Sequence, residues 1–312
     1  MNRTTYAFRN INYGLINQIL NMILPFILKT VLIKKVGAEF LGLSGLFSNL
    51  LGLIALVELG FCGATTYVLY KPIADNDQER VGSILNFYKQ IYFVVGLIIL
   101  LVGLAILPFI KFLVRGSIPF GLNIYIVYLF YLANKVLDYI LFEQKYLLIS
   151  VMQRRDLLSK VSIFVQVLYT ICSILAIQLF NSYYLFLLLI PMFKMCEKCI
   201  VSKIYNKHFK FFTTKHKIND ADRKSILNNV AHLSVHRLNS SVKDSLGSIV
   251  ISAFVGLSQV GLYGVYLSIS EAVSSLCSVF LSAIEHGVGI SVVKEDPHKN
   301  FEEMELIEFF YL

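Results

Sequence analysis

IYFVVGLIILLVGLAILPFIKFLV, residues 91–114, decides the fold class of this chain. No residue from Ile91 to Ile110 is charged, and the segment from Phe93 to Leu107 holds no polar side chain. A helix of about 20 apolar residues spans the roughly 30 Å hydrocarbon core of a bilayer. The stretch therefore predicts a transmembrane helix, and we expect lipid to surround most of it.

Further apolar runs of similar length lie on both sides of this stretch. They cover residues 11–33, 41–70, 121–142, 161–180, 183–205, 245–269 and 272–293. Of the 312 residues, 56% are hydrophobic and 15% are charged, whereas soluble domains have about 45–50% apolar and about 25% charged residues. The sequence predicts an all-α polytopic membrane protein with about eight transmembrane helices, and it excludes a soluble domain.

Lysine and arginine concentrate in alternate loops of this arrangement. The sparser set of loops holds only Lys34, Lys35, Lys111 and Arg115, whereas Arg3, Arg9 and the residues from Lys203 to Lys224 belong to the richer set. Cytoplasmic loops carry the excess of positive charge. We therefore expect a multi-pass protein of the plasma membrane with a cytoplasmic N-terminus. The same topology explains the net charge of +8 without a nucleic-acid partner.

The most polar stretch divides the chain into three parts. We expect an N-terminal lobe of six transmembrane helices over 1–205, a basic cytoplasmic linker over 206–236, and a C-terminal lobe over 237–312. Within the linker, Asn219 or Asp220 can cap an amphipathic helix whose apolar residues recur at helical spacing. This helix would meet anionic lipid headgroups; the alternative is a solvated linker.

The last segment, FEEMELIEFFYL at 301–312, reads as the start of a ninth helix. A transmembrane helix cannot end within the bilayer with unpaired carbonyl groups. We therefore expect a truncated C-terminal lobe of two helices and the start of a third.

Four of the predicted spans carry polar side chains along one helical face. The members are Asn10, Asn17 and Asn21; Ser44, Ser48, Glu58 and Cys62; Ser240, Lys243, Asp244, Ser248 and Ser252; and Glu271, Ser275, Ser278, Ser282 and Glu285. Serine and glycine stripes alone favour close helix packing. A carboxylate in mid-membrane costs about 2.5–3.5 kcal/mol, so Glu58 and Glu271 favour a water-filled cavity. Protonated, neutral glutamates are the alternative.

Catalytic and metal-binding patterns are weak in this sequence. The Cys196–Cys199 pair lacks a second ligand pair, and no glutamate follows His232 as a zinc-protease helix requires. We expect no enzyme activity, no metal and no cofactor.

Three stretches resemble a known family. FLGLSGLFSNLLGLIALVELGFCGATTYVLYKPIA at 40–74, NFYKQIYFVVGLIILLVG at 86–103 and ISAFVGLSQVGLYGVY at 251–266 are similar to polysaccharide repeat-unit flippases (Wzx type) of Gram-positive bacteria. These flippases belong to the multidrug, oligosaccharidyl-lipid and polysaccharide exporter (MOP) superfamily. The resemblance implies a two-lobe exporter whose second lobe is incomplete here. It also implies a central cavity lined by helices one, two, seven and eight, which are the helices with polar stripes.

The resemblance further implies the cargo, a polyprenyl-diphosphate-linked oligosaccharide. Arg237 and Lys243 would attract its pyrophosphate, Asn17 and Asn21 would bond its sugar hydroxyls, and Glu58 or Glu271 would couple transport to a cation gradient. The expected cavity residues are Asn17, Asn21, Ser48, Glu58, Arg237, Lys243, Asp244, Glu271 and Ser275. The alternatives are a cation-coupled drug exporter of the same superfamily and a non-functional fragment of a disrupted flippase.

Overall fold

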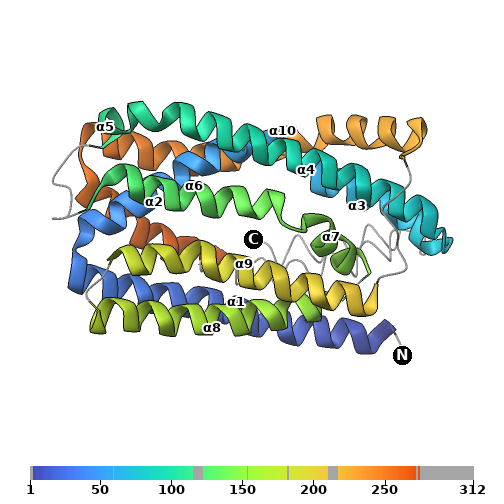
Figure 1. Cartoon of the computed structure of the whole chain (residues 1–312), viewed down its shortest axis with the longest axis horizontal. Coiled ribbons are helices and arrows are strands. Elements are labelled where there is room, and N and C mark those ends of the chain that lie inside the picture. Colours follow the sequence, from blue (N-terminus) through green and yellow to red (C-terminus); the bar gives the residue numbers. More distant parts are fainter. Residues whose placement is uncertain are drawn as a thin grey trace, which may run out of the picture. The chain divides into compact units, whose positions relative to one another are not determined.

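A computed structural model describes residues 3–58, 60–114, 122–152, 154–180, 183–209, 217–271 and 273–274. The chain divides into two units, Met1–Val265 and Tyr266–Leu312. Every regular element among the described residues is helical, so the predicted all-α membrane class is confirmed (Figure 1).

The helices follow one another with short connections. They are α1 (Arg3–Val36), α2 (Ala38–Ile54), η1 (Ala55–Glu58), α3 (Phe61–Ala74), α4 (Gln78–Ile106), η2 (Leu107–Phe109), α5 (Ile110–Leu113), α6 (Ile124–Ile140), α7 (Glu143–Val151), α8 (Arg155–Leu179), α9 (Tyr183–His208) and α10 (Asp220–Phe254). Residues 257–271 are also helical. Helices therefore lie at each predicted apolar run before residue 272, whereas 301–312 and nearly all of 272–293 lie outside the described residues.

Three described helices are long and apolar enough to cross a membrane: Asn12–Val36, Gln78–Leu113 and Arg155–Leu179. A fourth span results if α6 and α7, which bend by 53°, are counted together. The number of spans predicted from the sequence is larger, because the apolar runs were identified without regard to the charged residues and helix breaks within them. The α9 helix contains Lys194, Glu197 and Lys198, and α2 has only 17 residues.

The predicted single helix over 41–70 is wrong, because the chain breaks between α2 and α3. The α-helix changes at Ala55 to a 3-10 turn that ends at Glu58. Gly60 then adopts φ 90°, in the left-handed region that glycine enters without a steric penalty. Ser48 and Glu58 consequently do not share one continuous helical face.

The predicted linker helix and the seventh span are one continuous helix, α10. Its start confirms the predicted cap, since the Asn219 side chain accepts a hydrogen bond from the Asp222 backbone N–H at 2.6 Å. The helix ends at Phe254, and Gly256 (φ 132°) turns the chain before residue 257. The run 245–269 therefore contains two helices, separated by an uncharged turn.

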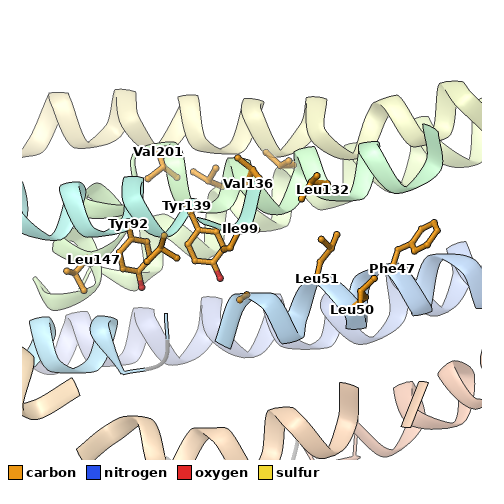
Figure 2. Close-up of a cluster of buried hydrophobic side chains, with 14 of the residues drawn as sticks. Phe47, Leu50, Leu51, Tyr92, Ile99, Leu132, Val136, Tyr139, Leu147 and Val201 are labelled. Atoms are coloured by element: carbon orange, nitrogen blue, oxygen red, sulfur yellow. The ribbon is translucent and has the colours of Figure 1, made fainter. Parts of the chain in front are cut away.

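Apolar side chains fill the space between α2, α4, α6, α7 and α9 (Figure 2). In α4, Gly96 and Gly103 allow close contact with α6: a Cβ at Gly96 would lie 2.8 Å from Ile140 Cγ1, and one at Gly103 would overlap Leu132. The opposite face of α4 exposes large apolar side chains, among them Leu101 at 65%. This exposed face agrees with the expected contact with lipid.

Candidate functional site

The predicted residues of α1 and α2 differ in exposure. Asn17 is half-buried, and its Oδ1 atom is buried with no hydrogen-bond partner among the described residues. Asn21 and Ser48 are exposed. An unpartnered buried amide oxygen is unfavourable, since it has lost its water without gaining a donor. Asn17 is therefore the residue of this group whose side chain could gain most from a hydrogen-bond donor.

Glu58 ends the turn η1 and is half-buried. Its carboxylate lies near Tyr139 of α6 and Tyr92 of α4. No lysine or arginine in the described part of the chain forms an ion pair with it. The helix break thus turns Glu58 toward α4 and α6 instead of along the Ser48 face.

For the other five predicted cavity residues, the structure does not show a position within a cavity. Arg237, Lys243 and Asp244 belong to α10, but their side chains lie outside the described residues, as does all of Ser275. Glu271 is exposed in the second unit. Their roles as cavity residues therefore stay predictions.

Two serines of the predicted seventh stripe are buried in helix contacts. Ser248 Oγ lies 2.7 Å from Asn49 Nδ2 of α2, which donates a hydrogen bond to it, and Ser252 Oγ donates to the Leu113 carbonyl at 2.6 Å. For these serines the helix-packing interpretation holds. Sequence reasoning missed Asn49, although an amide within an apolar run was the available signal.

Glycines bring α2 against the helix that begins at residue 257. A Cβ at Gly42 would overlap the Leu257 carbonyl oxygen and lie 2.7 Å from its carbon, and a Cβ at Gly261 would overlap the Ala38 carbonyl. Only a residue without a side chain permits this approach. The contact joins the ends of two segments that are more than 200 residues apart in the chain.

An ion pair lies at the opposite end of α10. Arg80, in the first turn of α4, donates from Nε to Asp222 Oδ2 at 2.8 Å and from Nη2 to Oδ1 at 2.7 Å. Asp222 is buried. Two parallel bonds of this kind are strong and directional, so they fix the start of α10 against α4. Neither residue was singled out from the sequence.

A second charged network lies between α6, α7 and α9. Lys198 is buried, pairs with Glu143, donates to the Asp138 carbonyl at 3.2 Å and lies over the Tyr146 ring. Lys194 pairs with Asp138 at 3.1 Å. The spacing of three residues between Lys135 and Asp138 would allow a pair within α6, but Lys135 lies over the Tyr139 ring instead. These pairs let α9 hold charges inside the protein.

The described residues hold no group of three or more histidine, cysteine or acidic side chains that could bind a metal ion. Cys196 and Cys199 are both exposed on α9.

No protein-family model matches the chain, and no curated protein matches it. A solved structure of a multidrug resistance MATE family transporter of the MOP superfamily, in an inward-facing conformation, is similar. The TM-score is 0.65 at 14% sequence identity, over 95% of this chain and 68% of that one. The chain therefore shares the fold of this transporter, and its long apolar helices are those of a multi-pass membrane protein.

Proposed function

We propose that the protein is a flippase that moves polyprenyl-diphosphate-linked oligosaccharide units from the cytoplasmic to the outer leaflet, for synthesis of a cell-surface polysaccharide. The observation that carries the proposal is the fold shared with a MOP-superfamily transporter. The resemblance of residues 40–74 and 251–266 to polysaccharide flippases supports the choice of cargo. In transporters built from repeats, the substrate lies between halves that rock against each other.

The glycine contact between α2 and residues 257–265 supports the rocking step. If the N-terminus is cytoplasmic, as the charge bias indicates, α1 ends near the outer surface and α2 begins there. The backbone contact at Gly42 and Gly261 then closes the outer side. Two backbones in contact can separate without disrupting interdigitated side chains, so such a contact suits a closure that opens.

Recognition of the cargo rests on residues of α1 and α10. Lys243 and Arg237 attract the pyrophosphate as a point charge and a planar fork. Asn17 and Asn21 bond sugar hydroxyls, and the buried Oδ1 of Asn17 is available to accept one. The remaining lining residues are Ser48, Asp244, Glu271 and Ser275. The basic linker over 206–236 contacts anionic headgroups of the cytoplasmic leaflet.

Glu58 is the candidate for coupling to a cation gradient. It is half-buried and lies near Tyr139, at a helix break. Ionisable groups within a membrane mark ion or proton pathways. Binding of a proton there would remove a charge at the break between α2 and α3, where the backbone can rearrange.

The second candidate function is cation-coupled drug export. It is favoured by the similar MATE transporter, which is a multidrug resistance protein, and by the aromatic neighbours of Glu58. This function does not require the cations of α10, so substitution of Lys243 distinguishes the two candidates.

Expression in a strain that lacks its polysaccharide flippase tests the proposal. We expect restored surface glycan, lost in Lys243→Ala and retained in the matched control Lys294→Ala. Equal behaviour of the two variants would refute the cargo assignment. Dye efflux without restored glycan would support the drug exporter.

A further inference from the structure

Three cations converge on one carboxylate where α1 and α8 pack together. Asp156, in the first turn of α8, is fully buried and contacts Arg9 Nη2 at 3.2 Å, Arg154 Nε at 3.1 Å and Lys160 Nζ at 3.8 Å. Its backbone N–H also donates to Asn10 Oδ1 of α1 at 2.8 Å. Asp156 therefore orients side chains from two helices around one point.

A single carboxylate meets several cations in this group. Asp156 pairs with Arg9 and Lys160 as well as with Arg154. Arg155 adds a further cation at the exposed start of α8, where its Nε donates to Ser150 Oγ at 2.8 Å. The helix dipole of the 25-residue α8 favours an anion at the same end. Arg9 and Lys160 keep 37% and 36% of their side chains exposed, so an anion can reach them.

An apolar stripe continues from this group along α8. Lys160 is followed at helical spacing by the exposed side chains Phe164, Leu168, Ile171 and Leu175. From Lys160 to Leu175 the helix rises about 22 Å at roughly 1.5 Å per residue. One leaflet contributes about half of a hydrocarbon core that is roughly 30 Å thick, so the stripe is long enough for an acyl chain.

An aromatic ring lies where the two parts meet. Tyr13 of α1 holds its ring 4.3 Å from Lys160 Nζ. Tyrosine is enriched at the level of lipid headgroups, where its ring contacts apolar groups and its hydroxyl contacts water. The arrangement thus places cations at headgroup depth and an apolar face below them.

We propose that Arg9, Arg155 and Lys160 bind the phosphate of an anionic glycerophospholipid, whose acyl chain lies along the α8 stripe. Charge complementarity selects an anionic headgroup over a zwitterionic one, and the stripe selects a lipid over a soluble phosphate. Asp156 is the positioning residue, because it pairs with Arg9 and Lys160 while both side chains stay partly exposed. None of these cations belongs to the expected cargo residues or to the basic linker over 206–236.

The chain contains no tryptophan, so Tyr13→Trp gives a single fluorescent reporter beside Lys160. The protein would be reconstituted in phosphatidylcholine vesicles that contain a small fraction of either brominated phosphatidylglycerol or brominated phosphatidylcholine. We expect stronger quenching by the brominated phosphatidylglycerol. One cation near an anionic lipid contributes a factor of about five, so Lys160→Gln or Arg155→Gln lowers the preference about fivefold. Lys203→Gln, on the exposed face of α9, keeps it.

Equal quenching by the two lipids in the reporter protein, or an unchanged preference in both site variants, would overturn the proposal. Inorganic phosphate at constant ionic strength distinguishes the two sources of the phosphate group. Loss of the preference at millimolar phosphate would identify an anion site that does not select lipid, and would also overturn it.

Discussion

The glycine contact between α2 and residues 257–265 gives a prediction with a definite sign. Replacing glycine by alanine inside a helix normally stabilises it by about 1 kcal/mol, through helix propensity. At Gly42 the new Cβ would lie 2.7 Å from the Leu257 carbonyl carbon and 3.1 Å from the Gly261 nitrogen. These atoms belong to the backbone, so they cannot rotate away.

The size of the effect follows from these distances. Carbon atoms pack best at about 3.5–4.0 Å, so Gly42→Ala requires the two segments to separate by about 1 Å. Overpacking of this kind costs about 1–3 kcal/mol. We therefore expect Gly42→Ala to lower the thermal midpoint, against the propensity effect, and Gly261→Ala to do the same.

Gly45→Ala is the matched control, because it lies one turn further along α2. A Cβ there meets Val260 Cγ1 at 3.9 Å, an ordinary contact. Thermal unfolding of the reconstituted variants would compare them. Gly45→Ala should be as stable as the parent protein or more stable. A Gly42→Ala protein as stable as Gly45→Ala would contradict the close backbone contact.

Other predictions concern the polar contacts within the first unit. Asn49→Leu leaves the buried Ser248 hydroxyl without its donor and should destabilise the protein by about 1–3 kcal/mol, and a double-mutant cycle with Ser248→Ala should show coupling. Glu143→Gln leaves Lys198 buried and unpaired, which should lower the free energy of unfolding by about 3–5 kcal/mol. Adding Lys198→Met to this variant should recover much of that stability. If a denaturation series showed no recovery, it would argue against the pair. Arg80→Lys keeps the charge but loses one of the two parallel hydrogen bonds to Asp222. The rate of amide hydrogen exchange at the start of α10 should therefore rise. An unchanged rate would show that the bidentate pair does not hold this end of the helix.

The sequence was sufficient for the fold class and for the position of most helices. Length and apolar content alone separate a membrane protein from a soluble one, and Asn219 marked a helix start because its side chain caps the backbone. Hydropathy did not reveal the break at Gly60, since apolar residues continue on both sides of this glycine. Its left-handed conformation became evident only in the structure.

Partnerships between distant segments could not be read from the sequence. Asn49 and Ser248 are separated by 199 positions, and Arg80 and Asp222 by 142. Local spacing instead favoured Lys135 as the partner of Asp138, because the two are close on one helix. The structure brings Lys194 of α9 to Asp138, and such a choice depends on helix packing that composition and periodicity do not encode.

The most direct test of the proposed function is transfer of a fluorescent polyprenyl-diphosphate-linked oligosaccharide across liposomes that contain the purified protein. We predict that the labelled lipid becomes accessible to a membrane-impermeant quencher in the second leaflet. The rate should fall at least about tenfold in Lys243→Ala, the effect of losing about 1.4 kcal/mol of binding. A rate equal to that of protein-free liposomes, measured with folded protein, would contradict the assignment as a flippase.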